Sequence, residues 1–74
     1  MSVKLKPKIK KIANRLKEHN INIVRVKGDH IAFNRVPKLE RPIILPNKNY
    51  LGHEVRKNLR NTCRELGIEI DDLI

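Results

Sequence analysis

The chain has 74 residues and carries 17 Lys and Arg side chains against 8 Asp and Glu, for a formal net charge of +9. This length allows one small domain, residues 1–74, and a core too small to surround a deep substrate cavity. No apolar run reaches the roughly 18–20 residues of a membrane span, and lysines interrupt the first eleven residues where a signal peptide would be continuously apolar, so we expect a cytoplasmic protein.

The first predicted element is a helix over about residues 6–19. Pro7 suits the first helical turn, where its missing N–H is not needed. Apolar residues then recur at helical spacing as far as Leu16, with basic residues around them. Asn20 follows the helix, and asparagine tolerates the left-handed conformation in which helices commonly end.

Three short antiparallel strands are predicted next. Residues 21–27 are rich in β-branched side chains, and Gly28-Asp29 suits a tight turn with positive φ. In the return strand, residues 30–36, the side chains of Ile31 and Phe33 alternate with those of His30, Ala32 and Asn34, which predicts one buried and one opposite face. Residues 43–45 form a third strand, and the prolines on either side of it are typical of a sheet edge.

A second helix follows a polar loop, in which Asn47 or Asn49 would provide the cap. Apolar residues from Leu51 to Leu66 keep to one helical face, Gly67 ends the helix, and the acidic and apolar tail fits one more helical turn. Cys63 lies on the apolar face and is expected to be a small buried hydrophobe. Both helices should cover the same face of the sheet, because neither buries its apolar stripe alone.

The charge distribution indicates a class of partner. All 17 basic residues lie within residues 1–64 beside four acids, whereas the last ten residues contain four acids and no base. A positive field of this kind attracts polyanions, of which nucleic acid is the commonest in a cell. A basic surface also serves solubility or binds an acidic protein, so charge alone does not assign an activity.

The pattern Leu16-x3-Asn20-Ile21-x3-Arg25-x2-Gly28-Asp29-His30-x2-Phe33 resembles the core of the HicA family of mRNA interferase toxins. The resemblance extends over nearly the whole chain, and it continues at Pro46, Leu59-Arg60 and Leu66-Gly67-Ile68. It implies a double-stranded-RNA-binding-domain-like (dsRBD-like) αβββα fold of the α+β class, with three antiparallel strands and two helices on one face. It also implies a small ribonuclease that cuts messenger RNA, with His30 as the catalytic residue and a HicB-like antitoxin as its protein partner.

The chain departs from the family pattern at Asn20, Ile21 and Asp29, where the family favours Gly, an aromatic residue and Ser. The third departure matters most, because a carboxylate beside the catalytic position would repel phosphate. Equally, it would stabilise the protonated form of His30. The sequence leaves both effects open.

Phosphodiester chemistry gives these residues roles. RNA carries its own nucleophile, the 2′-OH, so cleavage needs proton transfer and cations at the phosphoryl oxygens, and we expect neither a metal ion nor a cofactor. Histidine suits proton transfer near neutral pH. The cationic side chains expected to bind RNA are those of Arg25, Lys27 and Lys48 at the scissile phosphate, and of Lys8 and Lys11 along the backbone.

Two alternatives belong to other classes of protein. One is an RNA-binding module of the same fold without catalysis, in which His30 merely contacts the RNA backbone or packs. The other is a DNA-binding regulator that uses the second helix, although no helix-turn-helix pair is visible. Of the other histidines, His19 is expected to be structural in the last helical turn, and His53 to lie exposed near the start of the second helix.

Overall fold

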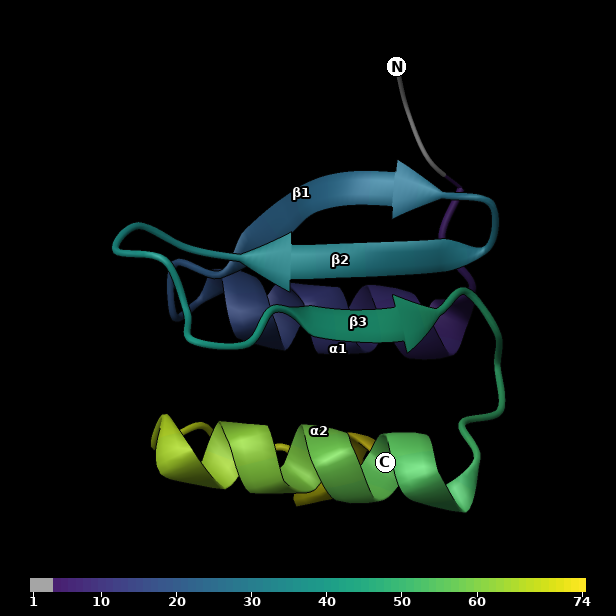
Figure 1. Ribbon diagram of the computed structural model, residues 1–74. Helices are drawn as coiled ribbons and strands as arrows, with labels where there is room; N and C mark the ends of the chain where they lie inside the picture. The colour runs from purple at the N-terminus through teal and green to yellow at the C-terminus, as the bar shows by residue number, and fades with distance from the viewer. Residues whose placement is uncertain (1–3) are drawn as a thin grey trace.

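The computed structural model describes residues 4–74 as an α+β domain with a three-stranded antiparallel sheet and two helices (Figure 1). The elements in chain order are α1 (Pro7–Lys17), β1 (Asn22–Lys27), β2 (His30–Asn34), β3 (Ile43–Pro46), α2 (His53–Glu65) and the short 3-10 helix η1 (Asp71–Leu73). No helix within residues 4–74 is long and apolar enough to cross a lipid bilayer.

The predicted elements are all present, and most of them are slightly shorter than expected. α1 ends at Lys17 and β2 ends at Asn34, two residues before the expected ends. The left-handed turn positions are confirmed, because Asn20 has φ 63° after α1 and Gly28 has φ 60° between β1 and β2. Glycine reaches this region without steric cost, which fits Gly28 to the reversal. The expected last turn of helix is η1.

The sheet has the order β1-β2-β3, with β1 and β3 at its edges. The pairing of Ile31 with Val26 and Leu45 places these three side chains on one face, whereas Ala32 lies opposite Arg25 and Ile44 on the other face. A bulge between Ile23 and Arg25 shifts the register of β1. The expectation that the third strand lies at an edge is confirmed.

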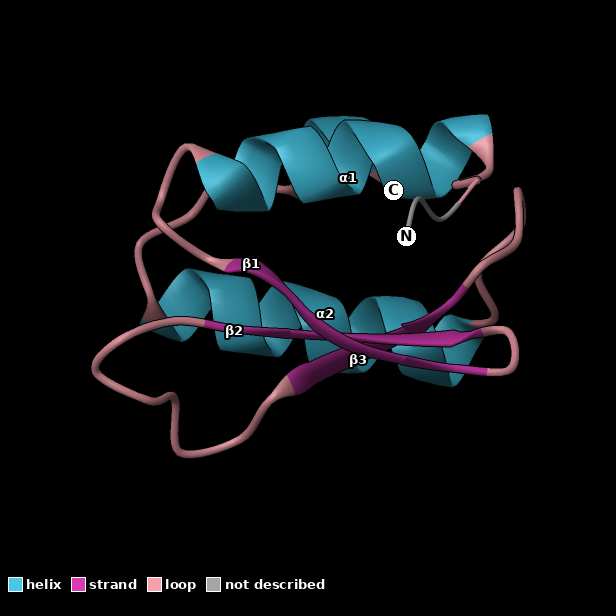
Figure 2. Cartoon of the chain, turned by 90° about the horizontal axis from the view of Figure 1, so that it is seen from above, coloured by secondary structure: helices cyan, strands magenta, loops and turns pink. Residues whose placement is uncertain are grey.

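The elements form two layers (Figures 1 and 2). α1 lies against one face of the sheet, whereas α2 lies beside β3, at the sheet's edge. The C-terminal segment, residues 68–74, lies in the layer of α1, and its helix η1 contacts α1. The expectation that both helices cover one face is therefore correct for α1 and wrong for α2. The C-terminal segment takes the place beside α1 that α2 was expected to fill.

One hydrophobic core joins the two layers. It receives side chains from both helices, from β2 and β3, and from the C-terminal segment, which supplies Ile68 and Ile70. Cys63 is fully buried in it, as expected. The buried members are Ile9, Ile12, Leu16, Ile21, Ile31, Phe33, Leu39, Ile43, Leu45, Leu51, Leu59, Cys63, Ile68 and Ile70.

Candidate nucleic-acid interface

His30 is the first residue of β2 and directly follows the Gly28-Asp29 turn. Its neighbour Ile31 faces the core, so strand alternation places His30 on the sheet face away from α1. Its side chain is 66% exposed. The imidazole is thus open to a large ligand from solvent, which is the position that a catalytic or RNA-contacting histidine requires.

The carboxylate of Asp29 contacts this imidazole. Oδ1 of Asp29 lies 3.2 Å from Nδ1 of His30, and both side chains are more than half exposed. A carboxylate beside Nδ1 favours the tautomer that carries the ring proton on that nitrogen. Within residues 4–74, Asp29 is the one ion-pair partner of His30. Nε2 is therefore the nitrogen that an incoming substrate would meet.

Two of the predicted cations share the face of His30. Lys27 is the direct cross-strand partner of His30, so their Cβ atoms are neighbours, about 5 Å apart. Arg25 lies opposite Ala32, two residues farther along the same face. All residues of β1 are exposed, which leaves both cationic side chains in solvent. The hairpin thus places an imidazole, an ammonium and a guanidinium on one open surface.

The loop between β3 and α2 places Lys48 close to this hairpin. The backbone N–H of Asn47 donates a hydrogen bond of 2.6 Å to the carbonyl oxygen of Asp29. Lys48 is the next residue, and its side chain is exposed. The structure therefore joins Lys48 to the turn that carries His30, although 18 residues separate the two in the sequence.

The asparagines of this loop do not cap α2, so that expectation is wrong. The N-cap residue of α2 is Gly52, and no side chain caps this helix. Instead, Asn47 binds the backbone of Lys4 and Lys6, and Oδ1 of Asn49 accepts a long hydrogen bond of 3.5 Å from the N–H of Lys8. The physical reason is that α1 begins next to this loop, with a Lys at its N-cap that offers no oxygen.

The two predicted cations of α1 differ in their distance from His30. Lys8 lies in the first turn of α1, at the end of the molecule that holds the β1–β2 turn and the β3–α2 loop (Figure 1). Lys11 lies about one turn farther along the helix. Both belong to the layer behind the sheet, so Lys8 and His30 face different sides of this end of the molecule.

The other two histidines are exposed, and neither shares the strand of His30. His19 lies just after α1, where its N–H donates to the carbonyl of Leu16, rather than in the last helical turn as expected. His53 is the first residue of α2. In the described part of the chain, no group of three or more His, Cys, Asp and Glu residues is arranged to hold a metal ion.

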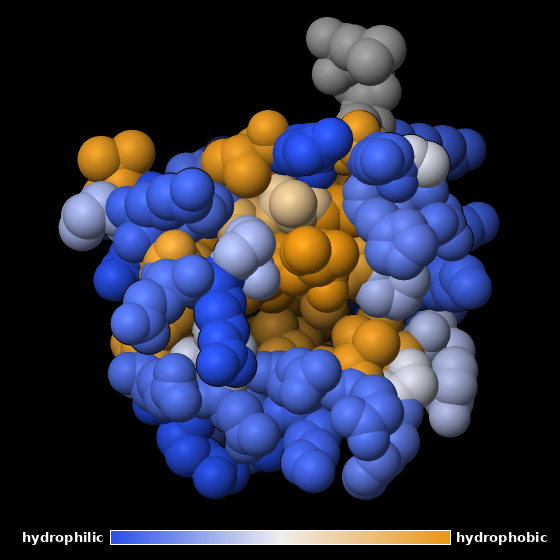
Figure 3. All heavy atoms as spheres, viewed as in Figure 1, coloured by the Kyte–Doolittle hydropathy of each residue, from blue (hydrophilic) through white to orange (hydrophobic). Residues whose placement is uncertain are grey.

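A separate hollow lies away from His30. A groove of about 880 Å³ runs between β3, the β2–β3 loop and α2. The groove opens on the face away from α1, and its floor is apolar, as Figure 3 shows. None of the predicted site residues lines it. The interface around His30 is therefore an open surface rather than a pocket.

No family model matches the sequence, and comparisons with curated proteins and with solved structures give no match.

Proposed function

We propose that this protein is a HicA-like endoribonuclease with a dsRBD-like fold. The element order of helix, three antiparallel strands and helix is compatible with that fold, and the position of α2 beside β3 is the one departure from its expected layout. The observation that carries the proposal is the exposed imidazole of His30, which has a carboxylate on Nδ1 and a lysine directly across the strand pair. These are the parts that metal-independent cleavage of RNA needs on an open surface.

In the proposed reaction, Nε2 of His30 removes the proton from the 2′-OH of RNA. The 2′-oxygen attacks the neighbouring phosphorus, a new O–P bond forms, and the bond to the 5′-oxygen breaks. The leaving oxygen takes a proton from water at the open surface, so the products are a 2′,3′-cyclic phosphate and a 5′-hydroxyl. Lys27, Arg25 and Lys48 offset the negative charge that grows on the phosphoryl oxygens.

Protein partners follow from the same proposal. A HicA-like toxin in the cytoplasm would be held inactive by a HicB-like antitoxin, and an acidic protein suits a chain with a charge of +9. Co-purification of the chain with the product of a neighbouring gene tests this part. A chain that purifies as a homodimer, with no such neighbour, would count against the toxin assignment.

The decisive experiment compares RNA cleavage by the parent and by His30→Ala, with EDTA present. We expect the substitution to reduce the cleavage rate by roughly 10²–10⁴-fold, the usual contribution of positioned acid–base catalysis. RNA binding should persist, because the cationic side chains remain. The matched control is His53→Ala, which removes another exposed imidazole and should cleave as the parent does.

The alternative is the RNA-binding module without catalysis. The observation in its favour is that the ion-pair partner of His30 within residues 4–74 is the carboxylate of Asp29, whose negative charge repels phosphate. Binding of RNA by the parent without turnover would establish the module. Undiminished cleavage by His30→Ala would remove His30 from the mechanism.

A further inference from the structure

We propose that Asn47 is a positioning residue that joins the segment Lys4–Lys8 to the RNA site, and that Lys4 and Lys6 bind RNA phosphates there. The inference rests on the proposed RNA-directed function, and it gives Asn47 a role other than the helix cap that the sequence suggested. It starts from the hydrogen bonds of one side chain.

The amide of Asn47 binds two backbone groups of the same segment. Its Oδ1 accepts from the N–H of Lys6 at 2.8 Å, and its Nδ2 donates to the carbonyl oxygen of Lys4 at 3.0 Å. The side chain thus uses an acceptor and a donor at once, as one peptide group does when it pairs with another. These contacts span 41 and 43 residues, so they fix the start of α1 against a distant loop.

The backbone of the same residue holds the turn that carries His30. The N–H of Asn47 donates to the carbonyl oxygen of Asp29 at 2.6 Å. One residue therefore contacts the lysine segment through its side chain and the catalytic turn through its backbone. Its next neighbour, Lys48, is a predicted phosphate-binding residue. Asn47 therefore brings the lysine segment and Lys48 to the turn that carries His30.

The lysines of the segment keep their ammonium groups for a ligand. Asn47 binds only the backbone of Lys4 and Lys6, and both side chains are exposed. The ion pairs recorded within residues 4–74 are made by Arg15, His30 and Arg60, and not by either lysine. Positive charge held in place without an acidic partner favours the binding of a polyanion.

Asn47 binds the lysine segment through its side chain and Asp29 through its backbone, so a substitution can remove the first contact and keep the second. Asn47→Ala removes both bonds to the lysine segment and keeps the N–H that binds Asp29. We therefore expect weaker RNA binding and a raised KM, with kcat within about twofold of the parent. The plot of log K against log salt should become less steep by up to about 1.4, since two lost contacts count roughly 0.7 each on single-stranded RNA.

The matched control is Asn58→Ala, which removes an exposed asparagine of α2 that lines the groove and not this interface. The charge itself is tested by Lys4→Ala/Lys6→Ala, made in the parent and in Asn47→Ala. We expect this double substitution to weaken RNA binding in the parent. In the Asn47→Ala background it should have a much smaller effect, because the segment is already detached.

Hydrogen exchange of the Lys6 amide reports, without RNA, on whether the Asn47 side chain holds the lysine segment. This amide should be protected in the parent and exchange faster in Asn47→Ala, while the thermal unfolding midpoint shows that the variant is folded. If the Lys6 amide loses protection but RNA affinity and salt slope stay at the parent values, the inference is wrong. A loss of kcat with unchanged affinity also contradicts it. Failure of the parent to bind RNA overturns the inference together with the proposed function, even where the exchange data confirm that Asn47 holds the lysine segment.

Discussion

Asp29 has two opposing effects at the scale of single residues. Its carboxylate lies 3.2 Å from Nδ1 of His30, where it orients the ring and favours the tautomer with its proton on Nδ1. The same negative charge lies beside the position proposed for a phosphate, which it repels. Both side chains are largely exposed, and exposed ion pairs contribute only about 0.2–1 kcal/mol. Asp29 is therefore expected to adjust the activity and not to abolish it.

We predict that Asp29→Ser lowers kcat by at most about fivefold, the rate equivalent of about 1 kcal/mol. The same substitution should lower KM, because a repulsive charge is removed from the phosphate site. Steady-state cleavage of a short RNA measures both constants. Glu54→Ser, which removes an exposed acid of α2, is the control. A loss of kcat as large as that of His30→Ala would make Asp29 itself essential and contradict this prediction.

Cys63 is an inert thiol because of its surroundings. It is fully buried in the core, and this burial raises the pKa of its thiol to about 11. At pH 8, thiolate is then scarcer by roughly two orders of magnitude than for a free cysteine. We predict that a thiol reagent modifies the folded protein very slowly and the urea-unfolded protein quickly. Rapid modification of the folded protein would show that the core around Cys63 opens readily.

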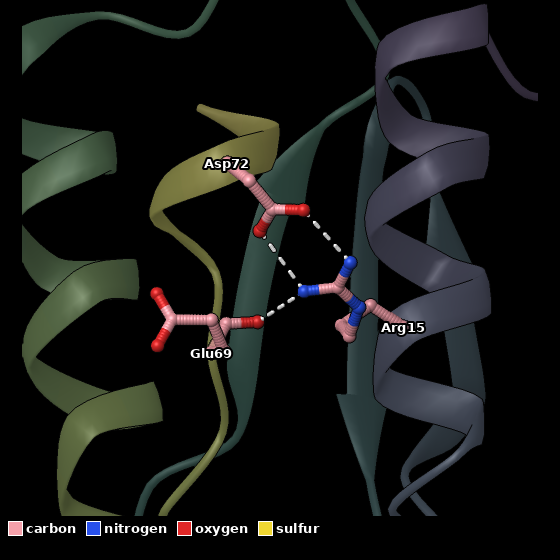
Figure 4. Close-up of polar contacts among 3 residues, drawn as sticks. All are labelled: Arg15, Glu69 and Asp72. Atoms are coloured by element: carbon pink, nitrogen blue, oxygen red, sulfur yellow. Dashed lines mark hydrogen bonds and ion pairs between the residues drawn. The ribbon is translucent and has the colours of Figure 1, made fainter.

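At the scale of elements, the C-terminal segment joins α1 to α2 through its acidic side chains. The guanidinium of Arg15, from α1, donates to both carboxylate oxygens of Asp72 at 3.0 and 2.9 Å and to the backbone carbonyl of Glu69 at 2.6 Å (Figure 4). A second ion pair joins Arg60 of α2 to Asp71 at 2.8 Å. The acidic tail therefore bridges the two helices, which the sequence showed only as an excess of negative charge.

The ion pair between Arg15 and Asp72 makes the stability of the fold depend on pH in a direction that can be worked out. The hydrogen bond from this guanidinium holds the pKa of Asp72 below its usual value. A carboxylate whose pKa is lowered by folding stabilises the protein above the ordinary Asp pKa of about 3.9, and this stabilisation is lost as the pH falls through the lower, folded-state pKa.

We predict that Asp72→Asn lowers the thermal unfolding midpoint at neutral pH and that the difference from the parent disappears in strong acid. High salt should also reduce the difference, since the pair is exposed and screened. Thermal melts of both proteins across this pH range measure it. Glu65→Gln is the control, because this exposed acid makes no ion pair within residues 4–74. A difference that stays constant down to strong acid would mean that the carboxylate is not its source.

At the scale of the whole molecule, the turns and loops place basic residues at two opposite ends. The β1–β2 turn, the β3–α2 loop and the start of α1 meet at one end, and the β2–β3 loop lies at the other end (Figure 1). His30 and most of the predicted phosphate-binding lysines lie at the first end. The basic residues Arg35, Lys38 and Arg41 lie in or beside the β2–β3 loop, next to the groove. The proposed RNA site uses only part of the positive surface.

This arrangement predicts that basic residues at the two ends contribute differently to the salt dependence of RNA binding. Lys48→Ala should make the plot of log K against log salt less steep by roughly 0.7 for single-stranded RNA, because one phosphate contact is lost. Arg41→Ala removes an exposed charge from the opposite end and should leave the slope unchanged. Fluorescence anisotropy of a labelled RNA at several salt concentrations measures both. Equal changes of slope would mean that RNA uses the whole basic surface.

Much of the fold could be predicted from the sequence because its causes are local. The alternation of Ile31 and Phe33 with His30 fixes which side chains of β2 face the core, and Asn20 and Gly28 supply the positive φ angles of two turns. Asn34 is an exception. The alternation places it with His30, yet it is buried, because its Oδ1 accepts from the N–H groups of Arg35 and Leu39 and so orders the following loop.

The sequence by itself determined the elements, their turns and the open position of His30, since periodicity and backbone preference act over a few residues. Only the tertiary structure decided that α2 lies beside β3, that Asn47 serves α1 and not α2, and that Asp72 pairs with Arg15. These contacts join residues 41 and 57 positions apart. Their partners are set by how whole elements pack around the shared core, which no local pattern records.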